Sequence, residues 1–223
     1  MNERLARLRL LQLASPSLPV GAYSYSQGLE AAIEACVVRD AASVASWIGD
    51  VMALCVASFE APVFLRLSAA WHTRDPDLAW RWNEELVASR ETAELRAETL
   101  QMGHSLRLLL RELSLDTSPI DAFEEVAYAT AFSFACHAWG VAPSEALEAY
   151  VFAWIESQAL AALKAVPLGQ TAAQRIVLDL AARVPELVER AACVRDEDLS
   201  NLAPGLAILS SRHETQYSRI FRS

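Results

Sequence analysis

The feature that most constrains the fold of this chain is an apolar pattern with the period of an α-helix. Leu5, Leu8 and Leu11 begin it, and the segments 44–59 and 147–155 repeat it over several turns. Residues three or four positions apart lie on one face of a helix, so each segment predicts a helix with one buried face. No segment alternates apolar and polar residues in the way a half-buried strand does.

The residue usage favours helices as strongly as the pattern does. The 223 residues include 40 alanines and 31 leucines, but only 16 valines, 7 isoleucines and 7 glycines. Good helix formers therefore outnumber the residues typical of strands and turns. We predict an all-α protein: a single-domain, bundle-like array of about eight to ten helices over residues 1–211, followed by a flexible C-terminal tail over residues 212–223.

Several local signals predict where helices begin and end. Asp40, and Asp75 followed by Pro76, are typical of helix starts. Ser24 with Gln27 matches a capping box, so a helix is expected to begin there. Pro62 is expected to kink or break the helix that precedes it.

Charge and cysteine usage narrow the class of protein. The net charge is −9, so we expect no nucleic-acid partner, because duplex-binding domains carry a basic stripe. The four cysteines lie far apart without a C-x-x-C pair, which is typical of buried thiols in a reducing compartment. The first residues lack the apolar run of a signal peptide, and the uncharged segment 126–144 has the composition of a core helix, not a membrane span. A cytoplasmic location without membrane attachment is expected.

No arrangement of residues in the sequence predicts catalysis, a metal site or a cofactor. The histidines are scattered, and E-x-x-H, H-E-x-x-H and phosphate-binding glycine motifs are absent. Glu94 and Glu98 lie one helical turn apart and could form a metal or acid–base pair, but a solvated helix face beside Arg90 and Arg96 is the favoured interpretation. We expect no enzyme activity, no metal and no cofactor.

Two segments are unusual for a plain helical domain. The turn at 166–171 follows Lys164, the only lysine beside 18 arginines, and precedes Gln174 and Arg175. The tail 212–223 holds three arginines, a tyrosine and a phenylalanine. Such a tail can be a frayed terminus, or a segment that folds on binding with arginine and aromatic anchors.

Three blocks of sequence resemble the UreF family of urease accessory proteins. They are residues 11–30 (LQLASPSLPVGAYSYSQGLE), residues 167–171 (PLGQT) with Gln174 and Arg175, and residues 213–223 (HETQYSRIFRS). Residues 91–96 (ETAELR) are similar to the charged helix start of the family, so the resemblance spans the chain. Ala172 and Ala173 depart from it, since many members have Asp-Gly there.

The resemblance implies an all-α, dimeric, non-enzymatic nickel-insertion chaperone that bridges UreD (also called UreH) and the GTPase UreG and assists nickel delivery to apo-urease. It implies that the tail is mobile alone and becomes ordered on UreD, with Tyr217 and Phe221 one helical turn apart as anchors. A polar patch would face UreG. Carried onto this chain, the expected partner-binding residues are Tyr25, Gln27, Glu30, Lys164, Gln170, Thr171, Gln174, Arg175, His213, Glu214, Tyr217, Arg219, Phe221 and Arg222.

Two alternatives remain open at this point. The first is a GTPase-activating regulator of UreG that supplies an arginine, for which the candidates are Arg175, Arg212, Arg219 and Arg222. The second is a di-metal or thiol enzyme of the helical-bundle type, which the ligand spacing of the sequence does not favour.

Overall fold

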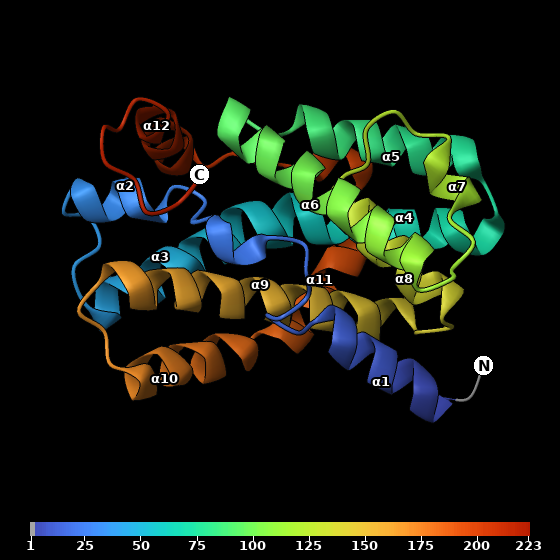
Figure 1. Cartoon of the computed structure of the whole chain (residues 1–223), viewed down its shortest axis with the longest axis horizontal. Coiled ribbons are helices and arrows are strands. Elements are labelled where there is room, and N and C mark those ends of the chain that lie inside the picture. The colour runs from blue at the N-terminus through green and yellow to red at the C-terminus, as the bar shows by residue number, and fades with distance from the viewer. Residues whose placement is uncertain (1–2) are drawn as a thin grey trace.

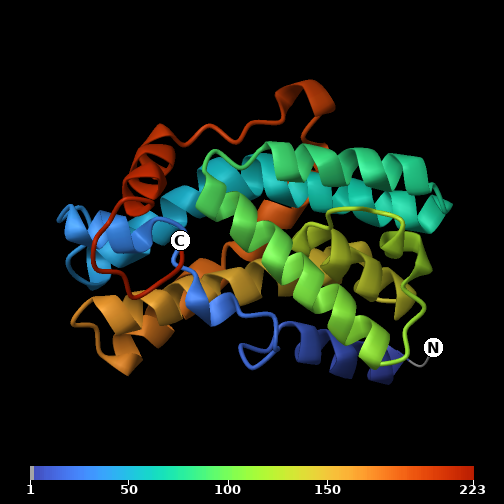
Figure 2. The same ribbon diagram turned by 45° about the horizontal axis from the view of Figure 1, so that its top comes forward.

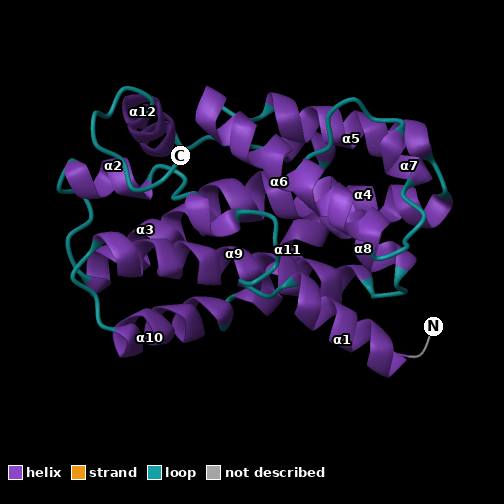
Figure 3. Cartoon of the chain, viewed as in Figure 1, coloured by secondary structure: helices purple, strands orange, loops and turns teal. Residues whose placement is uncertain are grey.

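The computed structural model describes residues 3–223, and these residues form one all-helical domain (Figures 1 and 3). The fold class predicted from the sequence is confirmed. Ten of the twelve α-helical segments in the described chain have ten or more residues. The segments are α1 (Glu3–Leu13), α2 (Leu29–Glu34), α3 (Ala41–Val51), α4 (Ala61–Thr73), α5 (Pro76–Ala88), α6 (Ala93–Glu112), α7 (Ser118–Asp121), α8 (Tyr128–Ala138), α9 (Pro143–Ala165), α10 (Gln170–Ala181), α11 (Val184–Cys193) and α12 (Pro204–His213). Two 3₁₀ turns, η1 (Ala22–Ser24) and η3 (Asp196–Asp198), and one π-helix, η2 (Met52–Glu60), lie between these segments.

The longest helix, α9, runs through the middle of the molecule with α10 and α1 on one side and α4, α6 and α8 on the other (Figure 1). Phe64, Phe132 and Tyr150 bring α4, α8 and α9 together, with ring centroids 5.1 to 6.1 Å apart. Trp71 donates from Nε1 to Ser133 Oγ at 3.0 Å, which satisfies two buried polar groups inside this core. The uncharged segment predicted to be a core helix is α8, and most of its residues are buried.

Helix α3, η2 and α4 follow one another without a gap, so Pro62 does not break the helix; the change that precedes it is one from α to π winding. Pro62 lies in the first turn of α4, directly after the nine-residue π-helical η2. Proline lacks an N–H and crowds the carbonyl four residues before it, and the wider π winding relieves both problems. The continuous stretch Ala41–Thr73 is long and apolar enough to cross a membrane, but 56% of its most apolar window is buried inside the domain, as in a core helix.

The helix starts predicted at Asp40 and at Asp75 with Pro76 are confirmed. Asp40 accepts from Ser43 N at 2.9 Å and completes a capping box, and Asp75 accepts from Leu78 N at 2.9 Å. The start expected at Ser24 was wrong: Ser24 ends η1, and α2 begins only after Gly28. The prediction that all four thiols are buried is correct for Cys55 and Cys136 and wrong for Cys36 and Cys193, which are exposed.

The C-terminal residues pack against the domain, so the flexible tail predicted for residues 212–223 is not confirmed. Helix α12 continues through the expected boundary and ends at His213. Residues 214–223, which we call the C-terminal strap, then return between α2 and α6 (Figure 2). Phe221 is 6% exposed and Ser223 is fully buried. The strap is held because its backbone N–H groups donate to acceptors on the domain.

Candidate functional site

The loop before α2 takes an unusual backbone path that brings the first sequence block against α12. Gln27 and Gly28 both have positive φ, at 53° and 77°. Glycine suits this position mainly because its φ is positive, and a Cβ there would also press on Leu206 Cδ1 of α12, at 3.0 Å. The close approach places Glu30, in the first turn of α2, beside the end of α12.

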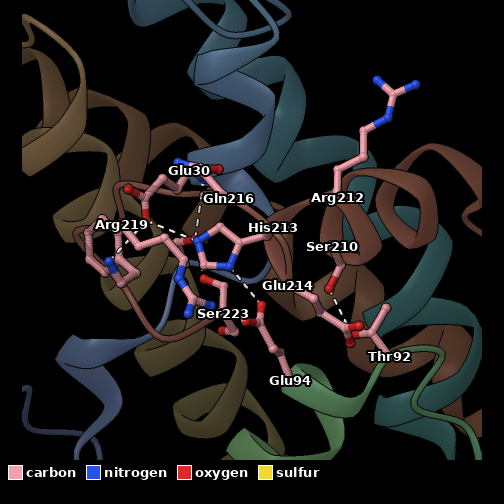
Figure 4. Close-up of polar contacts among 12 residues, drawn as sticks. Glu30, Thr92, Glu94, Ser210, Arg212, His213, Glu214, Gln216, Arg219 and Ser223 are labelled. Carbon is pink, nitrogen blue, oxygen red and sulfur yellow. Dashed lines mark hydrogen bonds and ion pairs between the residues drawn. The ribbon is translucent and has the colours of Figure 1, made fainter.

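The fully buried imidazole of His213 lies between two carboxylates from different helices (Figure 4). Its Nδ1 is 2.7 Å from Glu94 Oε2, on α6, and its Nε2 is 3.1 Å from Glu30 Oε2, on α2. Glu94 also accepts from Arg219 of the strap, at 2.6 Å. Buried charges are tolerated only when paired, and this cluster pairs two carboxylates with a guanidinium and an imidazole.

Glu30 also binds the backbone of the strap. Ile220 N donates to Glu30 Oε1 at 2.7 Å, and Phe221 N donates to Glu30 Oε2 at 2.9 Å. Two main-chain bonds extend the attachment towards the end of the strap. Arg222 N donates to Ser24 O at 2.8 Å, and Ser26 N donates to Ser223 O at 2.9 Å.

Gln27 connects the strap to the interior. It donates from Nε2 to Glu98 Oε1 at 2.7 Å and accepts from Trp154 Nε1, on α9, at 2.7 Å. Ser223 Oγ donates to the other oxygen of Glu98, at 2.8 Å. Burial raises the pKa of Glu98 to about 7. The solvated face expected for Glu94 and Glu98 is therefore wrong, because tertiary packing covers both carboxylates.

A second buried ionic group lies next to Glu98. Arg90 NH2 is 2.7 Å from Glu60 Oε2, and the Tyr150 hydroxyl donates to the other oxygen of Glu60. Burial alone would raise the pKa of Glu60, but the Arg90 guanidinium and the Tyr150 hydroxyl bring it below its usual value. The pocket beside this group has a volume of about 90 Å³, too small for an ordinary organic ligand.

The lone lysine lies where the second sequence block meets the first and the third. Lys164 Nζ donates to Tyr23 O at 3.2 Å and lies 5.6 Å from the Tyr23 ring centroid and 5.5 Å from that of Phe221. Tyr23, 66% exposed, was not among the predicted site residues. The only sequence feature that pointed to Tyr23 was its position in the first block, because no helical period includes it.

The structure divides the predicted partner-binding residues into a buried and an exposed group. Tyr25, Glu30, His213 and Phe221 are buried within the chain and Gln27 is half-buried, so these five organise the site from within. The exposed ones are Lys164, Gln170, Thr171, Gln174, Arg175, Glu214, Tyr217, Arg219 and Arg222.

The tail was expected to be helical around Tyr217 and Phe221 when it is ordered on UreD. In the chain without a partner the strap is ordered but not helical, so these two residues do not lie one helical turn apart here. Tyr217 points into solvent with its full surface exposed, whereas Phe221 packs inward. Glu214 accepts from Ala93 N at 2.9 Å and so helps to cap α6. Arg219 already has a carboxylate partner in Glu94.

The described residues contain no group of three or more histidine, cysteine, aspartate or glutamate side chains arranged to hold a metal ion. The polar groups gathered around the strap instead bond one another. The arrangement joins α2, α6, α9 and α12 to the strap and leaves an aromatic and several charged side chains at its surface.

Comparison with known proteins gives a consistent result. The profile of the UreF family matches residues 38–181. A protein of Azoarcus sp. (strain BH72), named urease accessory protein UreF, is 53% identical over 98% of this chain and 96% of its own length. Proteins of the same name from Dechloromonas aromatica and Methylobacillus flagellatus are 49% and 45% identical, each over 100% of both chains. These alignments, unlike the profile match, include the strap and the loop that holds it.

Proposed function

Because this chain belongs to the UreF family of urease accessory proteins, we propose that it is a non-catalytic, cytoplasmic scaffold for urease maturation. It bridges UreD (UreH) and the GTPase UreG, acts as a homodimer, and assists the insertion of nickel, its cargo, into apo-urease. The observation that carries this proposal is the C-terminal strap, which is tied down by buried bonds and yet presents a fully exposed Tyr217.

The strap has the properties of a docking element. Binding energy at protein interfaces is concentrated in a few aromatic and arginine side chains on an ordered base. Tyr217 is fully exposed, Ile220 is 64% exposed, and Arg222 of the same strap is also exposed. A backbone that is ordered before binding loses less conformational entropy on docking, so the ordered strap supports its assignment to UreD.

The second surface is assigned to UreG. It comprises Lys164 at the end of α9 and the exposed residues of the first turns of α10, which are Gln170, Thr171, Gln174 and Arg175. Lys164 contacts the Phe221 ring, so the two proposed surfaces meet at one residue. That contact supports a bridging role, because UreD and UreG would then bind side by side.

The test is co-purification of the full-length chain with UreD and UreG, together with nickel-dependent urease activation. Lys164→Ala is expected to lower UreG recovery about tenfold, as loss of an interface anchor does, and to weaken activation while the far-ultraviolet circular dichroism spectrum of the folded protein is kept. Arg195→Ala, which removes another exposed cation, is the control and is expected to behave as wild type. Normal activation in Lys164→Ala would show that the UreG assignment is wrong.

A further inference from the structure

We propose that Glu30 is a positioning residue that latches the C-terminal strap into the shape a partner recognises, and that it does not itself contact the partner. This inference rests on the proposed function for the identity of the partner, UreD. In this proposal Glu30 and His213 do not touch the partner. They act indirectly, by ordering the strap that presents Tyr217 and Ile220.

The carboxylate of Glu30 is placed to hold backbone, not to meet another protein. Each of its oxygens accepts one of two consecutive strap amides, from Ile220 and Phe221, at 2.7 and 2.9 Å. Its side chain is only 8% exposed. Hydrogen bonds to an ionised carboxylate are stronger than neutral ones, and two adjacent amides fix the direction of the strap as well as its position.

His213 joins this carboxylate to the rest of the domain. Its side chain has no exposed surface, and its two ring nitrogens face Glu30 and Glu94. Arg219 closes the network from the strap side through Glu94, at 2.6 Å. The strap is therefore bound to α2, α6 and α12 through one connected cluster (Figure 4).

Of the two residues whose amides Glu30 holds, Phe221 packs inward and Ile220 carries its side chain outward, as Tyr217 does earlier in the strap. Ile220, whose N–H donates to Glu30, is 64% exposed, and Tyr217 is exposed over its whole surface. A buried acid that holds an exposed apolar segment affects binding only by ordering that segment. Without the latch, the partner must supply the free energy of ordering the strap, and the apparent affinity falls accordingly.

The first measurement is hydrogen exchange at the amides of Ile220 and Phe221 in the isolated full-length protein. Glu30→Gln keeps the shape of the side chain but removes its charge and one of its acceptor oxygens. Exchange at both amides is expected to rise on the order of tenfold or more, as the loss of charge-assisted bonds implies. Glu34→Gln, an exposed carboxylate on the same helix, is the matched control and leaves exchange unchanged. If Glu30→Gln does not fold, Arg219→Ala removes the more exposed end of the network and must also speed exchange in the strap.

The second measurement is the affinity for UreD in a double-mutant cycle. Tyr217→Ala removes a solvent-exposed side chain, so its effect on affinity reports the strap surface alone. If Glu30 acts through the strap, Glu30→Gln weakens UreD binding about tenfold in the wild-type background, and much less once Tyr217 is alanine.

Wild-type exchange at Ile220 and Phe221 in Glu30→Gln would overturn the latch. The latch would also be overturned if the two substitutions lowered the affinity for UreD independently, so that the loss in the double variant equalled the product of the two single losses. Glu30 would then act separately from the strap. A wild-type chain that binds no UreD refutes the proposed function and the docking half of this inference; the exchange comparison needs no partner and still decides whether Glu30 holds the strap.

Discussion

Replacing Gly103 by alanine tests the close approach between α6 and the chain that leads into α8. Gly103 lies in the middle of α6, where the chain leading into α8 crosses it. A Cβ built there would lie 1.9 Å from Val126 O and 2.8 Å from the carbonyl carbon of Ala127. Both are backbone atoms, so no change of rotamer relieves the contact. The backbone of α6 or of residues 126–127 has to move.

Two effects of opposite sign decide the result. Alanine in the interior of a helix is favoured over glycine by about 1 kcal/mol. Overpacking a filled core typically costs about 1–3 kcal/mol, and a contact with backbone lies at the upper end of that range. We therefore expect Gly103→Ala to lower the free energy of unfolding by about 2 kcal/mol.

The assay is urea unfolding followed by tryptophan fluorescence and by far-ultraviolet circular dichroism. Gly205→Ala is the matched control, because Gly205 is also helical and a Cβ there meets no atom within 4 Å. It should leave stability unchanged or raise it slightly through helix propensity. A Gly103→Ala variant as stable as wild type, or more stable, would refute the packing argument.

Two further predictions concern ionisable groups in the core. Because burial raises the pKa of Glu98 to about 7, the folded protein binds a proton there that the unfolded chain has released above its ordinary value near 4.5. The stability that this group contributes is fully present below the ordinary pKa and falls by about 3 kcal/mol as the pH rises to 7. The free energy of unfolding, measured across this pH range, should therefore fall less steeply in Glu98→Gln than in the wild type. An identical slope would contradict the buried position of Glu98. A thiol reagent at pH 8 should label the exposed Cys36 and Cys193 rapidly, but not Cys55, whose pKa burial raises to about 12, or the buried Cys136. Four fast thiols in the native protein would show that the core is open.

The residues of the candidate site were only partly accessible to sequence reasoning. The family blocks identified Glu30 and His213 as important without any knowledge of the fold, and Lys164 was noticed as the only lysine, three residues before the second block. The same reasoning placed Glu30 and His213 at a surface. Their burial depends on a contact between α2 and α12 that joins residues 183 positions apart in the chain, and no local pattern encodes it.

The sequence by itself determined that this protein is all-helical, where several helices begin, and that it shows no catalytic motif, because apolar period, capping aspartates and motif spacing are local properties. Only the tertiary structure decided which charged residues are buried. Glu98 was expected in solvent and lies in the core, and the tail was expected to be free and is bound. The physical reason is that a carboxylate can be buried only where donors from other elements meet it, and Gln27, Ser223 and the strap amides reach these carboxylates only after the chain has folded.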